Sequence, residues 1–259
     1  MNTRTQLRFS LLLALSLFGS VFSTPSAADA LPTYGILPAS VLRIEAIELP
    51  SKSLAGPGKW QGLVCSPQGC ELRPVRLAIQ KQPGEDKVRI SYAPVGKRSK
   101  VKGEFTIALV NSIPGVGKKA IPTWFTLRTS RRPEDAVNGS LGVTVQTPEQ
   151  GDYHLVPRWN PKPGVNTLTL YLEHNRQRQP LGLIDLDVIR NAAMKTSAML
   201  IWAGDLDGDG KIDLITRVRE GSSASGLYLW LSTHAGEGEM VGVAAFLDDW
   251  TDVEEADGC

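Results

Sequence analysis

The chain has 259 residues, and its 28 Lys and Arg nearly balance its 27 Asp and Glu, so the formal net charge is +1. A near-neutral chain has no overall charge that would attract nucleic acid or a membrane surface, so neither partner is expected. Once the N-terminal segment described next is set aside, roughly 230 residues remain, enough for one large all-β domain or two smaller ones.

The N-terminal segment has the pattern of a secretory signal peptide. Arg4 and Arg8 are followed by an apolar run over residues 9–22 and by small residues over 23–30, where two overlapping cleavage sites fit. The apolar run is too short to span a bilayer comfortably, which takes roughly 20 residues. We predict a signal peptide over residues 1–30, a periplasmic or secreted mature protein, and no transmembrane segment after signal removal. An uncleaved N-terminal anchor is the alternative.

Most of the remaining chain has the pattern of short β-strands separated by turns rich in Gly, Pro or Lys. Strands are predicted over residues 41–49, 75–79, 88–92, 105–110, 124–127, 141–145, 153–156, 168–172 and 181–186, and one short helix over 188–197. Many short strands at close spacing indicate an all-β fold of mainly antiparallel sandwich-like or barrel-like sheets with little helix.

The chain is divided near residue 118. This gives an N-terminal β-module over residues 31–118 and a C-terminal β-module over residues 119–259 that holds the metal loop described below. A single continuous domain is the alternative.

Three cysteines fit an oxidising compartment. Cys65 and Cys70 enclose Ser-Pro-Gln-Gly, a turn composition between two apolar runs, which places them across a tight hairpin where a disulfide can form. Their spacing is not the Cys-x-x-Cys of oxidoreductases, and no second Cys or His pair lies nearby to complete a zinc site. Cys259 is left over, either as a free thiol or as one half of an intermolecular disulfide.

The strongest motif is the acidic loop Asp-Leu-Asp-Gly-Asp-Gly-Lys-Ile-Asp over residues 205–213. Calcium takes six to eight oxygen ligands, which closely spaced carboxylates and carbonyls supply. The predicted ligands are the carboxylates at loop positions 1, 3, 5 and 9 and the carbonyl at position 7, which belong to Asp205, Asp207, Asp209, Asp213 and Lys211. Gly208 and Gly210 permit the sharp backbone course that brings these groups to one centre. The sequence therefore predicts a Ca²⁺ site.

This loop departs from an EF-hand. Its twelfth position is Thr216, where that motif has a bidentate Glu. The flanking segments 199–202 and 212–215 are apolar and favour strands, so the loop is expected to join two β-strands. Water, Asp249 or another acid of the C-terminal tail would take the place of the missing ligand.

The string Asp-x-Asp-Gly-Asp-Gly-x-x-Asp-Leu between strands resembles the calcium loops of integrin-α-like FG-GAP and VCBS repeats, over residues 200–218. The rest of the chain does not match, and a propeller of such repeats would need several copies. Residues 200–259, which end in Gly258-Cys259, are similar to uncharacterised exported bacterial proteins that carry a single loop of this kind. The resemblance implies a periplasmic or secreted location and no established activity.

No catalytic motif is recognisable, and a Gly-x-Ser-x-Gly elbow is absent from the sequence. The first function hypothesis is an exported calcium-binding β-protein with a non-catalytic binding or structural role, in which calcium clamps a β-hairpin and the partner is an unknown protein or glycan. The alternative is a carbohydrate-binding or glycan-cleaving β-sandwich with a structural calcium. Trp159 and Trp250, in polar segments, are candidate sugar contacts, whereas Trp202 and Trp230 are expected in the core.

Overall fold

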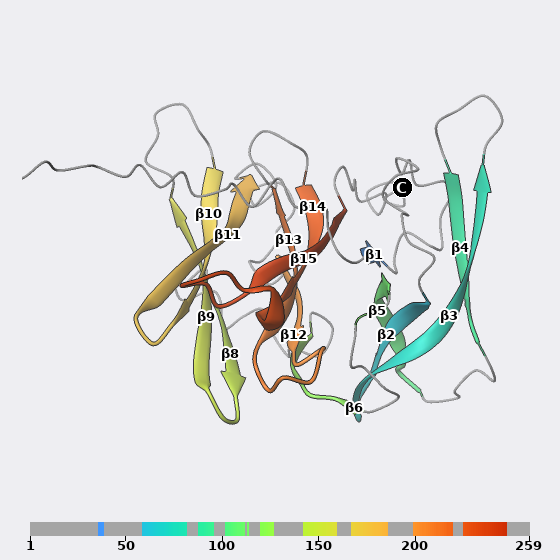
Figure 1. Cartoon of the computed structure of the whole chain (residues 1–259), viewed down its shortest axis with the longest axis horizontal. Helices are drawn as coiled ribbons and strands as arrows, with labels where there is room; N and C mark the ends of the chain where they lie inside the picture. The colour runs from blue at the N-terminus through green and yellow to red at the C-terminus, as the bar shows by residue number, and fades with distance from the viewer. Residues whose placement is uncertain are drawn as a thin grey trace, which may run out of the picture. The chain divides into compact units, whose positions relative to one another are not determined.

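The fold is described from a computed structural model of the chain, shown in Figure 1. The structure describes residues 36–38, 59–81, 88–95, 102–111, 113, 120–126, 142–159, 167–185, 199–219 and 225–247. The predicted signal peptide, the predicted strand over 41–49, the predicted helix over 188–197 and Cys259 lie outside these residues. By compactness the chain divides into Met1–Leu31 and Pro32–Cys259, and the description below concerns the second unit.

The first sheet is antiparallel, with the strand order β1-β5-β2-β3-β4 and with β6 paired to β3. Its strands are β1 (Ile36–Pro38), β2 (Trp60–Ser66), β3 (Gly69–Lys81), β4 (Val88–Pro94), β5 (Phe105–Asn111) and β6 (Ala120–Ile121). The central strand β2 lies between its sequence neighbour β3 and the distant strand β5.

The β2–β3 hairpin carries the predicted disulfide. Cys65 and Cys70 are directly opposite each other in the register and are bonded, which confirms the pairing expected from their spacing. Both are almost fully buried, so the bond serves as part of the sheet's core.

The second sheet is also antiparallel and has the order β15-β14-β13-β11-β10-β9-β8, with β12 paired to β13 on one side and to β7 on the other. Its strands are β7 (Thr123–Thr126), β8 (Val143–Thr147), β9 (Gly151–Trp159), β10 (Thr167–His174), β11 (Gln177–Asp185), β12 (Leu200–Gly204), β13 (Asp213–Arg219), β14 (Ser225–Leu231) and β15 (Gly242–Leu247). The short 3-10 helix η5 (Ser232–His234) follows β14, and no α-helix occurs among the described residues. The predicted all-β, mainly antiparallel fold is confirmed.

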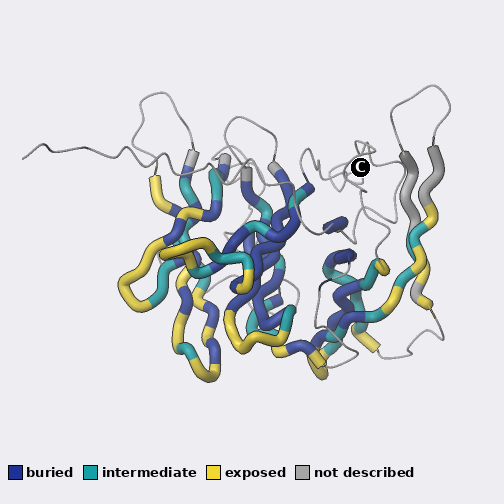
Figure 2. Tube along the Cα trace, in the orientation of Figure 1, coloured by how far each residue is buried: buried dark blue, intermediate teal, exposed yellow. Residues whose placement is uncertain are grey.

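Alternation of side chains explains why the outer strands form. In β9, Tyr153 and Leu155 are buried whereas His154 and Arg158 are exposed, the period of two that places apolar groups on one face of a sheet. Figure 2 shows this change between buried and exposed positions along the hairpins of the second sheet.

Strand β14 is buried on both faces and lies between two apolar clusters. Leu227, Leu229 and Leu231 belong to a cluster that also contains Leu63 of β2, so both sheets contribute to it. Tyr228 and Trp230, on the opposite face of β14, belong to a second cluster formed by the second sheet. A strand covered on both sides reads as a continuous apolar run, which is what residues 227–231 show. The chain's division near residue 118 remains a prediction.

Candidate metal centre

The acidic loop joins two strands in the interior of the second sheet. Strands β12 and β13 pair antiparallel up to Gly204 and Asp213, which are opposite each other, so the loop is the end of a β-hairpin as expected. Because β7 pairs with the other edge of β12, the start of the loop is held from two sides. The N–H of Asp205 also donates to the carbonyl of Pro122, at 2.9 Å, and this bond ties the first acidic residue to the segment before β7.

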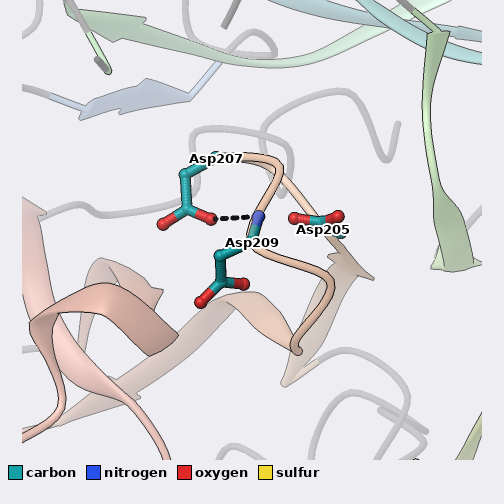
Figure 3. Close-up of side chains that lie close together, drawn as sticks. All are labelled: Asp205, Asp207 and Asp209. Carbon is teal, nitrogen blue, oxygen red and sulfur yellow. Dashed lines mark hydrogen bonds between the residues drawn. The ribbon is translucent and has the colours of Figure 1, made fainter. Parts of the chain in front are cut away.

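Three of the predicted ligands converge. One carboxylate oxygen from each of Asp205, Asp207 and Asp209 lies within 4.8 Å of the other two (Figure 3). Two oxygens bound to the same calcium ion at 2.3–2.6 Å are at most about 5 Å apart, so this spacing fits an ion of that size. Burial decreases along the loop: Asp205 is buried, Asp207 is intermediate and Asp209 is exposed. The three carboxylates therefore extend from the buried end of β12 to the protein surface.

The loop backbone supports these carboxylates. The N–H groups of Gly208 and Gly210 donate to the two oxygens of Asp205, at 2.7 and 3.1 Å, and the N–H of Lys211 donates to Asp209 at 2.8 Å. The dashed line in Figure 3 marks a further bond of 3.3 Å, from the N–H of Asp209 to Asp207. Gly208 and Gly210 have φ of +83° and +80°, the left-handed conformation for which glycine was expected at these positions.

Asp213 lies apart from the three converging carboxylates and has a different set of contacts. It is fully buried, and one of its oxygens accepts the N–H groups of Leu206 and Asp207, at 2.6 and 3.3 Å. Its other oxygen accepts the N–H of Ser232 at 2.9 Å. Asp213 thus holds the start of the loop to its end and to the segment after β14. Its role as a ligand, and that of the Lys211 carbonyl, remain predictions.

The loop concentrates negative charge in a partly buried place. Burial raises the pKa of Asp207, and so do the charges of Asp209 and Asp205, while a hydrogen bond from Thr233 opposes the shift. Burial and the charge of Asp207 raise the pKa of Asp213 to about 8, in spite of its three backbone donors. Both shifts have the causes expected where carboxylates crowd together away from water, and a bound cation would relieve this crowding.

Two hydroxyl groups from a distant segment complete the surroundings of the loop. The Ser232 hydroxyl donates to Asp209 at 2.7 Å, and the Thr233 hydroxyl donates to Asp207 at 2.5 Å. Sequence analysis did not single out these residues. The folded sheet brings them there: Trp230 is opposite Leu214, so the residues after β14 lie beside the loop before β13.

Trp202 and Gly204 lie in β12, directly before the acidic loop. The indole of Trp202 is fully buried, as expected from its apolar run, and its Nε1 has no hydrogen-bond partner in the described part of the chain. A Cβ at Gly204 would collide with ring carbons of Trp202 and with the carbonyl oxygen of Pro122. Only glycine lets the backbone approach both groups this closely.

Comparison of this chain with protein-family models, with curated proteins and with solved structures finds no match. Within the described residues, no helix is long and apolar enough to cross a membrane. The three converging carboxylates of the acidic loop could hold a metal ion.

Proposed function

We propose that the protein is an exported calcium-binding β-protein with a non-catalytic binding or structural role, in which calcium clamps the β12–β13 hairpin. The observation that carries this proposal is the convergence of Asp205, Asp207 and Asp209 within 4.8 Å, at a loop between two buried strands. Carboxylate oxygens are the ligands that hard cations prefer, and calcium accepts irregular arrangements of them more readily than magnesium does. The resemblance of the loop to FG-GAP and VCBS calcium loops supports the same ion.

The clamp acts by joining segments that are far apart in the sequence. Asp205 is bonded to the segment before β7 through Pro122, whereas Asp207 and Asp209 are bonded to the segment after β14 through Thr233 and Ser232. An ion shared by the three carboxylates therefore links the loop after β12 to the segment before β7 and to the segment after β14. Because the unfolded chain has no such cage, the free energy of ion binding adds to the free energy of folding.

The proposed location is the periplasm or the outside of the cell. The Cys65–Cys70 disulfide is compatible with an oxidising compartment. The signal-peptide pattern of residues 1–30 supports export, and the partner is proposed to be a protein or a glycan.

Thermal unfolding of the mature chain, residues 31–259, tests the proposal. Melting curves are measured by circular dichroism in EDTA, in Ca²⁺ and in Mg²⁺. Calcium at a hundred times its dissociation constant stabilises a protein by about 2.7 kcal/mol, and for a chain of this size each kcal/mol shifts the melting temperature by about 2–4 °C. We expect an increase of about 5–10 °C in Ca²⁺ and a smaller one in Mg²⁺.

A matched pair of variants shows whether the shift comes from the loop. The double variant Asp207→Asn, Asp209→Asn should lose the calcium response, whereas Asp152→Asn, an exposed aspartate of β9, should keep it. Superimposable curves of the parent chain in EDTA and in Ca²⁺ would rule out the clamp.

A second candidate function is carbohydrate binding, and the observation that favours it is the exposure of Trp159. Its side chain is 59% exposed at the end of β9. An exposed indole offers a flat apolar face on which a sugar ring can stack. Trp250, the other candidate contact, lies outside the described residues.

A glycan array on the mature chain and on Trp159→Ala tests the second candidate. Carbohydrate binding predicts a glycan signal that Trp159→Ala removes while the melting temperature stays unchanged. Glycan cleavage, the stronger form of this function, additionally requires two carboxyl groups at the separation that hydrolysis uses. An array without any signal would leave the calcium-binding, non-catalytic role as the better account.

A further inference from the structure

The segment between β14 and β15, residues 232–241, is a compact connection. The proposed function involves only its first two residues, Ser232 and Thr233. Within it, the N–H of Ala235 donates to the carbonyl of Ser232, and the N–H of Glu239 donates to the carbonyl of Gly236. The Glu239 carboxylate accepts the N–H of Gly236 in return, at 2.9 Å. We refer to this segment as the 232–241 connection. These internal bonds fold residues 232–239 into a short turn.

The near end of the 232–241 connection is bonded to carboxylates of the acidic loop through the contacts already described. Ser232 uses its N–H on Asp213 and its hydroxyl on Asp209, and Thr233 uses its hydroxyl on Asp207. The acceptor in each of these three bonds is a carboxylate of the acidic loop, and its position depends on the repulsion between the neighbouring carboxylates.

The far end of the 232–241 connection is anchored on β11. The side-chain carbonyl of Gln179 accepts the N–H groups of Met240 and Val241, at 2.8 and 3.1 Å, and its amide donates to the carbonyl of Val241 at 2.6 Å. The amide of Gln177 donates to the carbonyl of Gly238 at 2.6 Å. Gln179 and Val241 are both buried, so this anchor is shielded from water.

A cation and the 232–241 connection act on the same carboxylates. Crowded carboxylates repel one another and move apart unless something holds them. The hydroxyls of Ser232 and Thr233 hold the carboxylates of Asp209 and Asp207 in the position in which they converge. Cation binding then has a smaller entropic cost, because these side chains are already ordered. Coupling between two such events is reciprocal, so the cation favours the bound position of the connection by the same factor.

We propose that Ser232 and Thr233 are positioning residues of the cation site, and that cation binding in turn fixes the Ser232–Thr233 end of the 232–241 connection against the acidic loop. This inference rests on the proposed function, because it names what regulates the affinity of that site and which segment responds to it. The responding segment includes Gly236 and Glu239, which are exposed, so the effect of the cation reaches the protein surface.

The size of the effect follows from the hydrogen bonds that are removed. Loss of one hydroxyl donor to a carboxylate is expected to weaken calcium binding about fivefold, and loss of both about 20- to 30-fold. By reciprocity, calcium should slow amide exchange in the 232–241 connection more in the parent chain than in a variant without the hydroxyls, by a similar factor.

The experiment uses the whole mature chain, with calcium affinity measured by isothermal titration calorimetry and amide exchange followed by mass spectrometry in Ca²⁺ and in EDTA. Thr233→Val and Ser232→Ala remove the donors, and Thr233→Ser restores one. The control is Thr144→Val, which removes an exposed hydroxyl bonded to His154, a residue of β9. We expect about fivefold weaker binding in Thr233→Val and near-parent binding in Thr233→Ser and in Thr144→Val.

The outcomes separate this inference from the proposed function. No calcium binding by the parent chain would remove the proposed function and the inference together. Calcium binding that protects residues 205–213 but leaves exchange over residues 232–241 unchanged would overturn the inference alone, as would parent-like affinity in Thr233→Val. If Ser232→Ala does not fold, since Ser232 is buried, the exposed Thr233 decides the question by itself.

Discussion

Gly204 has no room for a side chain, and this makes Gly204→Ala a sharp test of how the loop is seated. An added Cβ would overlap the carbonyl oxygen of Pro122 and would lie 2.7 Å from Cη2 of the Trp202 ring. The carbonyl belongs to the backbone and the indole is fully buried, so neither can move without displacing its neighbours. Overpacking of this kind costs about 1–3 kcal/mol. Separation of the two segments also weakens the bond from Asp205 to Pro122, worth about 1 kcal/mol.

We therefore expect Gly204→Ala to lower the free energy of unfolding by about 2–4 kcal/mol and to weaken calcium binding. Urea unfolding followed by circular dichroism measures the first effect and calorimetric titration the second. Gly236→Ala is the matched control, because its Cβ would meet only the flexible carboxylate end of Glu239 at 3.1 Å. A Gly204→Ala variant within about 0.5 kcal/mol of the parent chain would refute the close approach described here.

Three further perturbations test other parts of the structure. Burial acts to raise the pKa of Glu173, but its two arginine partners lower it below the ordinary value of 4.5. The contribution of Glu173 to stability, about 0.5 kcal/mol at this partly exposed site, is therefore present near neutral pH and lost as the pH falls through the lowered pKa. Glu173→Gln should be less stable than the parent near neutral pH and should approach it in acid, and a difference that stays constant over the acid range would contradict this. Replacement of Cys65 and Cys70 by Ala should cost about 2 kcal/mol in urea unfolding, because the unfolded chain loses a cross-link, and an unchanged midpoint would show that the bond has no such role. Trp230→Phe removes the 2.8 Å bond from the indole to the buried hydroxyl of Thr216 and should lower the free energy of unfolding by about 1–3 kcal/mol. Denaturant unfolding measures this loss, and parent-like stability would contradict it.

The parts of the structure that sequence reasoning predicted are those encoded locally. The acidic loop was identified because three of its four carboxylates recur at every second residue, and its two glycines have the positive φ that such a course requires. The Cys65–Cys70 hairpin was identified for the same reason, since the turn composition lies between the two cysteines. In each case the interacting groups are fewer than ten residues apart.

The parts that sequence reasoning missed depend on contacts between distant segments. Strand β15 was not predicted, because its Gly-Val-Ala-Ala-Phe-Leu sequence has no alternation, and it is a strand because β14 pairs with it. The pairing of β5 between β1 and β2 cannot be read from either strand alone. The contacts of Ser232 and Thr233 with the acidic loop depend on the register between β13 and β14, which only the folded sheet defines.

Direct titration of the mature chain with calcium tests the central claim. Isothermal titration calorimetry of the metal-free protein is predicted to show one calcium ion bound per chain, and the double variant Asp205→Asn, Asp207→Asn is predicted to bind none. A parent chain that releases no binding heat and takes up no calcium in equilibrium dialysis would contradict the account, and so would a double variant that binds as tightly as the parent.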